Sequence, residues 1–185
     1  MIGGAMKVIP YQEQYRDRCR DICIHTGSHD NLVNQQHHDF SLLMYCDPYL
    51  DHGKCYLLQD DQNEIQGYIL CCEDGNSFLK YMPSYFQRIH EVAPSFEYRC
   101  DISEYERYIN EYPAHLHIDI LETCCGKGSG TLLMTTLLND LRKNHCKGIM
   151  VGVAKDNVRA CSFYQKMGFN ILEESDGGYV MGQKL

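Results

Sequence analysis

The sequence predicts a mixed α/β fold in one domain. The chain has 185 residues, a length typical of a single compact domain. Two apolar runs on either side of Asp60-Asp61-Gln62-Asn63 predict an antiparallel hairpin, and the second half of the chain alternates short apolar runs with segments of helical spacing. With 44% hydrophobic and 23% charged residues, the composition is that of a globular protein rather than a disordered one.

The first quarter of the chain is expected to contain one strand and two helices. Residues 7–10 form a short apolar run that predicts a strand, and residues 11–24 have helical spacing. The apolar patch at residues 40–45 predicts a second helix, flanked by loops rich in His, Asp and Asn. We expect these loops to include three solvated histidines, His29, His37 and His38.

The middle of the chain is predicted to hold the hairpin and two further helices. The hairpin strands are expected at residues 55–58 and 65–70. Residues 77–91 have the pattern of a helix despite Pro83, and residues 102–110 that of a shorter helix capped by Asp101 or Ser103. These helices suggest a helical insertion at about residues 77–110.

The last third alternates strands and helices. The expected strands are residues 115–121, 148–153, 170–173 and 179–183, and the expected helices are residues 130–144 and 158–167. The sequence contains no internal repeat and no low-complexity segment.

Net charge and cysteine content restrict the class of protein. A formal charge of −8 disfavours nucleic acid as a partner, because binding to a phosphate backbone needs a basic surface. Acidic residues near a site would instead attract a cationic amine. Eleven cysteines, two pairs of them adjacent and with no secretory signal before them, fit reduced thiols in a cytoplasm better than disulfides.

Membrane and metal partners are not expected. No apolar run reaches the roughly 18 residues that a membrane helix requires. Cys19 and Cys23 lack a second paired cluster at zinc-finger spacing. Residues 1–6 look like an expression remnant, so the single domain is expected to span residues 7–185.

A glycine-rich turn lies between a predicted strand and the predicted helix at residues 130–144. It contains Gly126, Gly128 and Gly130, which let the backbone approach a ligand closely. The free N–H groups and the dipole of the following helix favour a pyrophosphate. The spacing fits neither a Walker loop nor the dinucleotide-binding fingerprint, and a tight structural turn is the alternative.

The segment from Asn157 to Phe169 makes the assignment more specific. Its helix ends Phe-Tyr-x-Lys-x-Gly-Phe, and it follows the glycine turn by one helix and one strand. The combination resembles the GNAT superfamily of N-acetyltransferases, whose loop reads Gln/Arg-x-x-Gly-x-Gly/Ala. This chain has Cys125 where Gln or Arg is usual. The resemblance implies a central, mostly antiparallel sheet with a splayed parallel pair, flanked by helices.

The resemblance also implies a cosubstrate, an acceptor and a set of site residues. The expected cosubstrate is acetyl-CoA, and the acceptor is a primary amine of a small molecule or of a protein lysine, in a monomer or a homodimer. Tyr164 is expected to protonate the departing thiolate, unless it is a core aromatic, and Asn157 to contact the cosubstrate, cap a helix, or both. The expected cofactor-binding residues are Ile118, Ile120, Leu121, Gly126, Lys127, Gly128, Ser129, Gly130, Thr131, Asn157, Ala160, Phe163, Tyr164 and Lys166.

An amine acceptor is protonated at neutral pH, so a base is needed before it can attack. His117 and Asp119 are two residues apart on a predicted strand and therefore share one face with His115. Asp119 or His117 is the candidate base or substrate anchor, and a hydrogen-bonded pair within the sheet is the alternative. A metal bound by all three side chains is disfavoured, because same-face neighbours on a strand stand about 6–7 Å apart.

A closer resemblance covers about residues 55–185. Residues 112–121 and the strand Gln66-Gly67-Tyr68 look like the acetyltransferase-like domain at the end of O-GlcNAc hydrolases and its free-standing bacterial relatives. No glycosidase activity is implied. The alternative to an enzyme is a sensor or scaffold that binds acetyl-CoA and catalyses little, and Tyr164 argues against it.

Overall fold

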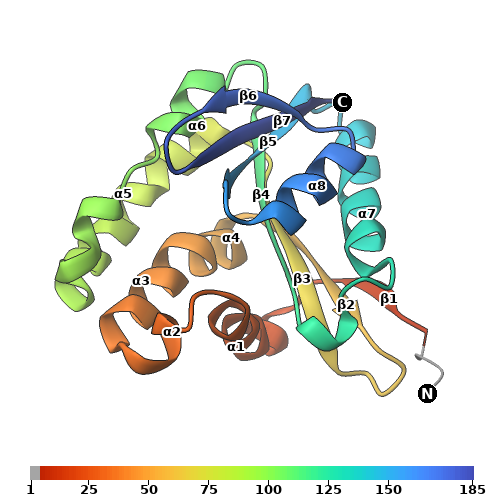
Figure 1. Ribbon diagram of the computed structural model, residues 1–185, viewed down its shortest axis with the longest axis horizontal. Coiled ribbons are helices and arrows are strands. Elements are labelled where there is room, and N and C mark those ends of the chain that lie inside the picture. The colour runs from red at the N-terminus through yellow and green to blue at the C-terminus, as the bar shows by residue number, and fades with distance from the viewer. Residues whose placement is uncertain (1–4) are drawn as a thin grey trace.

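The computed structural model describes residues 5–185 and contains one seven-stranded sheet (Figure 1). Of the expected expression remnant, residues 1–4 lie outside this part. The strand order is β1-β2-β3-β4-β5-β7-β6, and β4 with β5 is the one parallel pair in the described sheet. The strands are β1 Lys7–Pro10, β2 Lys54–Gln59, β3 Ile65–Cys72, β4 Ala114–Ile120, β5 Gly148–Ala154, β6 Asn170–Glu174 and β7 Gly178–Lys184. The predicted mixed α/β fold, its hairpin and its mostly antiparallel sheet are confirmed.

Helices cover both faces of this sheet (Figure 1). The α-helices are α1 Arg16–Thr26, α2 Asp30–Val33, α3 Gln35–Tyr45, α4 Asp47–His52, α5 Gly75–Val92, α6 Ser103–Tyr108, α7 Ser129–Lys143 and α8 Val158–Lys166. Three short 3₁₀ turns are η1 Glu13–Tyr15, η2 Pro94–Arg99 and η3 Glu122–Cys124. Helices α1 and α3–α6 pack on one apolar core, whereas α7 and α8 pack on a second core across the sheet. Within residues 5–185, no helix is long and apolar enough to cross a membrane.

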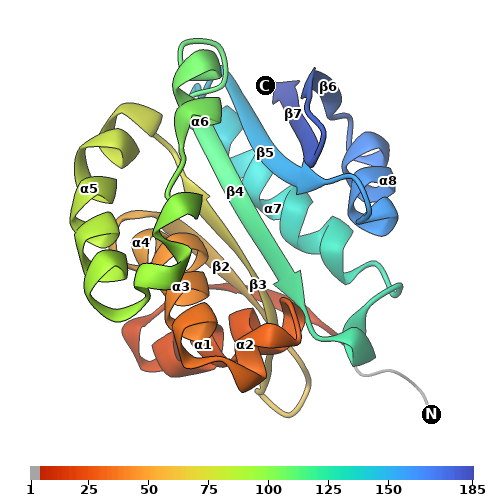
Figure 2. The same ribbon diagram turned by 60° about the vertical axis from the view of Figure 1, so that its left-hand side comes forward.

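Strands β4 and β5 separate soon after they meet, as Figure 2 shows. They pair at Ala114 with Ile149 and at His115 with Met150, and no later residue of β4 pairs with β5. On its other edge β4 pairs with β3 along its length. The result is a gap between β4 and β5 that opens toward the carboxyl end of both strands.

The backbone of β4 presents free donors to this gap. The N–H of Leu121 donates to the carbonyl of Gln66 on the β3 side at 2.9 Å. Because N–H groups alternate between the two edges of a strand, those of Ile118 and Ile120 face the opposite edge, where β5 has moved away.

The N-terminal helices differ from the sequence prediction in two respects. Helices α2 and α4 were not predicted, although Pro48 at the start of α4 is a typical first-turn signal. The expectation of a solvated His37 is wrong: His37 lies in α3, is 7% exposed and stacks on Phe96 at a centroid distance of 4.7 Å. This interpretation failed because burial by the distant η2 turn leaves no local pattern in the sequence.

Candidate active site

The N-terminus of α7 has unsatisfied backbone donors. Its N-cap residue is Gly128, which provides no side-chain hydrogen bond. The N–H groups of Ser129, Gly130 and Thr131 donate to no acceptor among residues 5–185. A 15-residue helix that begins with free N–H groups and the positive end of its dipole forms a binding site for an anion.

The three glycines of this turn have two different functions in the structure. Gly126 and Gly128 have φ values of +73° and +85°, and a Cβ added at either would meet no heavy atom within 4 Å. A Cβ at Gly130 would instead lie 3.2 Å from Cε2 of Phe163 in α8. The first two glycines therefore keep a left-handed turn open to solvent, whereas Gly130 permits the close packing of α7 against α8.

Arg159 of α8 lies beside the unusual Cys125. The Arg159 guanidinium is 3.0 Å from Oε2 of Glu122. Burial raises the pKa of the Cys125 thiol, and the neighbouring charge of Arg159 opposes that rise. The Lys127 side chain turns back to the carbonyl of Thr123 at 2.9 Å. The guanidinium of Arg159 in α8 thus lies next to position 125, where this chain has Cys in place of the usual Gln or Arg.

Helix α8 carries the remaining residues of the second motif. The Oδ1 atom of Asn157 accepts a hydrogen bond from the N–H of Ala160 at 3.1 Å, so Asn157 caps this helix. Lys166 is exposed at its end. Tyr164 is 5% exposed, packs against Phe169 and makes no side-chain hydrogen bond within the described chain. Burial and then the charge of Asp119 raise the Tyr164 pKa well above its usual value.

His115, His117 and Asp119 share one face of β4, as predicted, but their environments differ. His115 is fully buried, and its Nδ1 atom is 2.9 Å from the Tyr49 hydroxyl. Its ring stacks on Tyr105 at 4.4 Å, and burial lowers its pKa to about 3. His115 therefore belongs to the core.

The Asp119 carboxylate accepts a hydrogen bond within the described residues, whereas the His117 imidazole makes none. The Tyr68 hydroxyl donates to Oδ2 of Asp119 at 2.5 Å, and burial raises the pKa of this carboxyl. The His117 ring packs against Tyr45 and Tyr49, and its nitrogens make no hydrogen bond within residues 5–185. Burial lowers the His117 pKa to about 4, so the imidazole is neutral at pH 7 with a free lone pair.

A cavity of about 500 Å³ opens next to His117, on the face of the sheet covered by α1–α6. It is bounded by α6, the carboxyl half of β5 and the start of β7, and its lining includes Tyr45, Glu104, Tyr105, Gly152 and Tyr179. Sequence analysis missed Glu104, because its place in the cavity depends on packing against Gly152 of β5, which is distant in sequence.

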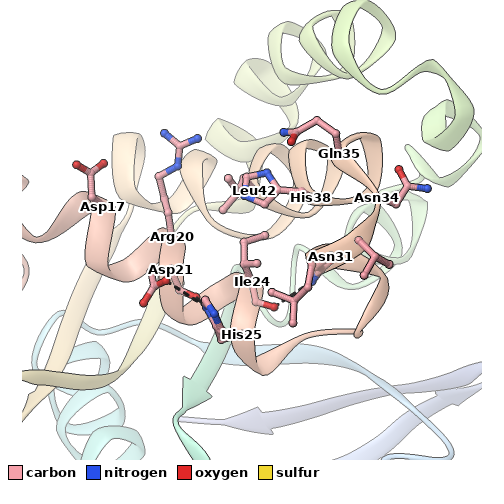
Figure 3. Close-up of a pocket in the computed structure, with 12 residues that line it drawn as sticks. Asp17, Arg20, Asp21, Ile24, His25, Asn31, Asn34, Gln35, His38 and Leu42 are labelled. Carbon is pink, nitrogen blue, oxygen red and sulfur yellow. Dashed lines mark hydrogen bonds and ion pairs between the residues drawn. The ribbon is translucent and has the colours of Figure 1, made fainter.

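A second cavity, of about 620 Å³, lies between α1, α2 and α3 (Figure 3). Its side chains include Arg20 and His38, together with Asp21 and His25, whose Oδ1 and Nδ1 atoms are 3.1 Å apart. All of its lining residues fall within residues 17–42, and none is a predicted site residue. The smaller cavity is therefore the candidate site, because it alone of the two contacts β4 and β5.

Buried His115 and half-buried His117 predict an acid-sensitive fold. The pKa values of His115 and His117 in the folded chain lie below the usual 6.5, so the unfolded chain binds more protons at pH 5. Their contribution to stability is complete above about pH 6.5 and is lost as pH falls toward 4. Urea unfolding should show a loss of about 2 kcal/mol per histidine between pH 7 and pH 5. His115→Gln should remove about half of this pH dependence, and an unchanged dependence would contradict the assignment.

Comparisons with known proteins agree with this geometry. The model of the "Acetyltransferase (GNAT) family" matches residues 20–169. The crystal structure of SsHAT is 25% identical, with a TM-score of 0.80, over 97% of this chain and 98% of that chain. PH1933 from Pyrococcus horikoshii OT3 is 17% identical, with a TM-score of 0.63, over 98% and 99% of the two chains. A third structure, histone acetyltransferase HPA2 and related acetyltransferase from Corynebacterium glutamicum ATCC 13032, is 16% identical with a TM-score of 0.64, over 96% and 95%.

Proposed function

Because the chain belongs to the GNAT family of acetyltransferases, we propose that it transfers an acetyl group from acetyl-CoA directly to a primary amine in a ternary complex. Acetyl-CoA-dependent acetyl transfer is general for this family. One observation carries the proposal for this chain. Strands β4 and β5 diverge after two paired positions, so the N–H groups of Ile118 and Ile120 have no partner on β5, and the cavity beside His117 is lined by residues of both strands.

The described residues fit acetyl-CoA, which supplies an acetyl group activated as a thioester. The N–H groups of Ser129, Gly130 and Thr131 would hold the pyrophosphate in the space kept open by Gly126 and Gly128. The N–H groups of Ile118 and Ile120 would bind the pantetheine and polarise the thioester carbonyl. Leu121 was predicted to bind the cosubstrate as well, but its N–H donates to the carbonyl of Gln66 on the β3 side, so it is left out of this set. Asn157, Ala160, Phe163 and Lys166 of α8 would complete this site.

His117 is the candidate that receives the proton of the acceptor. Of the two residues predicted for this role, Asp119 already holds the Tyr68 hydroxyl, whereas His117 lines the cavity with free nitrogens. An imidazole with a pKa of about 4 is too weak to deprotonate an ammonium ion at neutral pH, so the acceptor would attack in its uncharged form, the minor form in solution. His117 can take the proton as the new C–N bond forms, because the nitrogen then becomes strongly acidic.

Tyr164 is the candidate acid. Its raised pKa keeps the hydroxyl protonated at every pH at which the protein would be assayed. The hydroxyl has no partner in the described chain, so it is free to donate to the thiolate sulfur as that group departs.

Arg159 is expected to replace the missing basic residue of the loop. Arg159→Ala should weaken acetyl-CoA binding about 10-fold in calorimetry, because one exposed charge-assisted hydrogen bond to phosphate is lost. The difference should shrink in high salt, since the guanidinium is exposed. Cys125→Arg in the Arg159→Ala background should restore affinity for acetyl-CoA. A double variant that binds as weakly as Arg159→Ala alone would contradict the proposal that Arg159 replaces the basic residue missing at position 125.

The proposed function is tested by release of free coenzyme A from acetyl-CoA across a panel of amines and lysine peptides. We expect release that depends on the amine, with acetylated amine found by mass spectrometry. Tight acetyl-CoA binding without turnover on any amine would favour a sensor or scaffold instead. The motifs at residues 112–121 further support kinship with the acetyltransferase-like domain of O-GlcNAc hydrolases, which is part of the proposal.

A further inference from the structure

The cavity beside His117 contains a carboxylate without a partner. Glu104 is half-buried in α6 and makes no hydrogen bond or ion pair within residues 5–185. Its carboxylate lies on β5 at Gly152, where an added Cβ would approach Oε1 at 2.8 Å. The lack of a side chain at Gly152 therefore gives this carboxylate its position on the strand.

Glu104 and His117 line the same cavity. His115 is level with Met150 in the parallel register, so His117 and Gly152 are level two residues later on the diverging strands. Met150 belongs to the core under α1–α6, and Gly152 faces the same side because side chains alternate along a strand. A molecule in the cavity would therefore contact the His117 imidazole on the β4 side and the Glu104 carboxylate on the β5 side.

The charges of the cavity are unbalanced. Asp101, Glu104 and Glu173 line it together with one cation, Arg107. Arg107 is already paired with Glu173 at 3.0 Å. Burial raises the pKa of the Glu104 carboxyl and the charge of Asp101 raises it further, so a bound cation would relieve an unfavourable arrangement.

Aromatic rings complete the surroundings of this carboxylate. Tyr45, Tyr105 and Tyr179 line the same cavity. One face of Tyr105 stacks on His115 and one face of Tyr179 lies under Lys155, so a ligand cation would meet the remaining surfaces of these rings. A volume of about 500 Å³ is within the usual range for small-molecule sites.

We infer that the acceptor is a small amine with a second cationic group, and that Glu104 binds this second cation while the attacking amine lies near His117. The inference rests on the proposed acetyl transfer and adds the class of acceptor and its specificity-determining residue. An amino acid would be disfavoured, because its carboxylate would face Glu104 and Asp101. A monoamine would lose the contact with Glu104.

The experiment compares diaminobutane, butylamine and aminobutyrate as acceptors for the full chain, together with a lysine peptide. We expect kcat/KM for diaminobutane to exceed that for butylamine by about 10- to 100-fold, the scale of a partly buried ionic hydrogen bond. Glu104→Gln should reduce this ratio toward one, mainly through KM for the diamine. Gly152→Ala should reduce it as well, because the new methyl group displaces the carboxylate.

Glu106→Gln is the matched control. Glu106 is in the same helix, is exposed and does not line the cavity, so the change in net charge is the same while the ratio should stay at the wild-type value. Calorimetric titration of diaminobutane without acetyl-CoA gives a second readout. Binding should be detected for the wild type and be at least about 10-fold weaker for Glu104→Gln.

Equal or inverted preference among the three amines, faster acetylation of the peptide, or a ratio unaffected by Glu104→Gln would overturn the inference and leave acetyl transfer intact. Glu104-dependent binding of the diamine without acetylation of any amine would contradict the proposed function, while supporting the ligand class. If the diamine is neither bound nor acetylated, the inference is overturned.

Discussion

Gly128→Asn is expected to raise the dissociation constant for acetyl-CoA by about 100-fold or more. Gly128 has φ +85° and open space around its missing Cβ, next to the free N–H groups of α7. Asparagine tolerates the left-handed conformation better than other residues, so the turn should persist. Its side chain would then fill the space in which we place the pyrophosphate, and isothermal titration calorimetry measures the loss.

Gly168→Asn separates this loss from backbone strain. Gly168 also has a positive φ, +93°, and an added Cβ would meet the movable end of Gln183 rather than open space. Both variants should lose a similar amount of stability, on the order of 1–2 kcal/mol. Only Gly128→Asn should lose acetyl-CoA. Equal affinities in both variants would rule out the loop as the pyrophosphate site.

Tyr164→Phe is expected to lower turnover by about 10²-fold, the usual scale for loss of a general acid. The ring keeps its packing against Phe169, and no hydrogen bond of the described chain is lost, so stability and acetyl-CoA affinity should stay near wild type. The rate should be measured in single turnovers, where chemistry limits it. The leaving group is a thiolate, which needs protonation less than an alkoxide does because thiols ionise more readily than alcohols. The effect of Tyr164→Phe should therefore be smaller with a cosubstrate whose thiol has a lower pKa.

Tyr112→Phe is the matched control for the loss of a hydroxyl. Tyr112 is 9% exposed, Nζ of Lys184 lies over its ring at 4.4 Å, and it precedes the end of β4 at which β4 and β5 are still paired. Its loss should leave turnover unchanged. Wild-type turnover in Tyr164→Phe would make Tyr164 a packing residue, and a loss of acetyl-CoA affinity would make it a binding residue.

Short-range patterns predicted the strand–turn–helix units accurately. The hairpin at β2 and β3 was predicted from two apolar runs around a polar turn, and α5 was predicted despite Pro83. The cap of α6 was predicted less well: the N-cap is Ile102, while the Asp101 carboxylate accepts a hydrogen bond from the N–H of Ser103 at 2.9 Å. Alternative local hydrogen bonds of this kind differ little in energy, so helix ends are harder to place than helix interiors.

The sequence by itself determined the order of the seven strands, the glycine turn before α7, the capped helix α8 and the shared face of His115, His117 and Asp119. All of these depend on residues close together in the chain, where periodicity and turn chemistry act. Only the tertiary structure decided which of these three side chains is available in the cavity. Tyr49 is hydrogen-bonded to His115 and Tyr68 to Asp119, whereas His117 makes no hydrogen bond within the described residues. The same holds for Glu104, Gly152 and Arg159. Their positions follow from packing between elements 30 or more residues apart, and such packing leaves no local signal in the sequence.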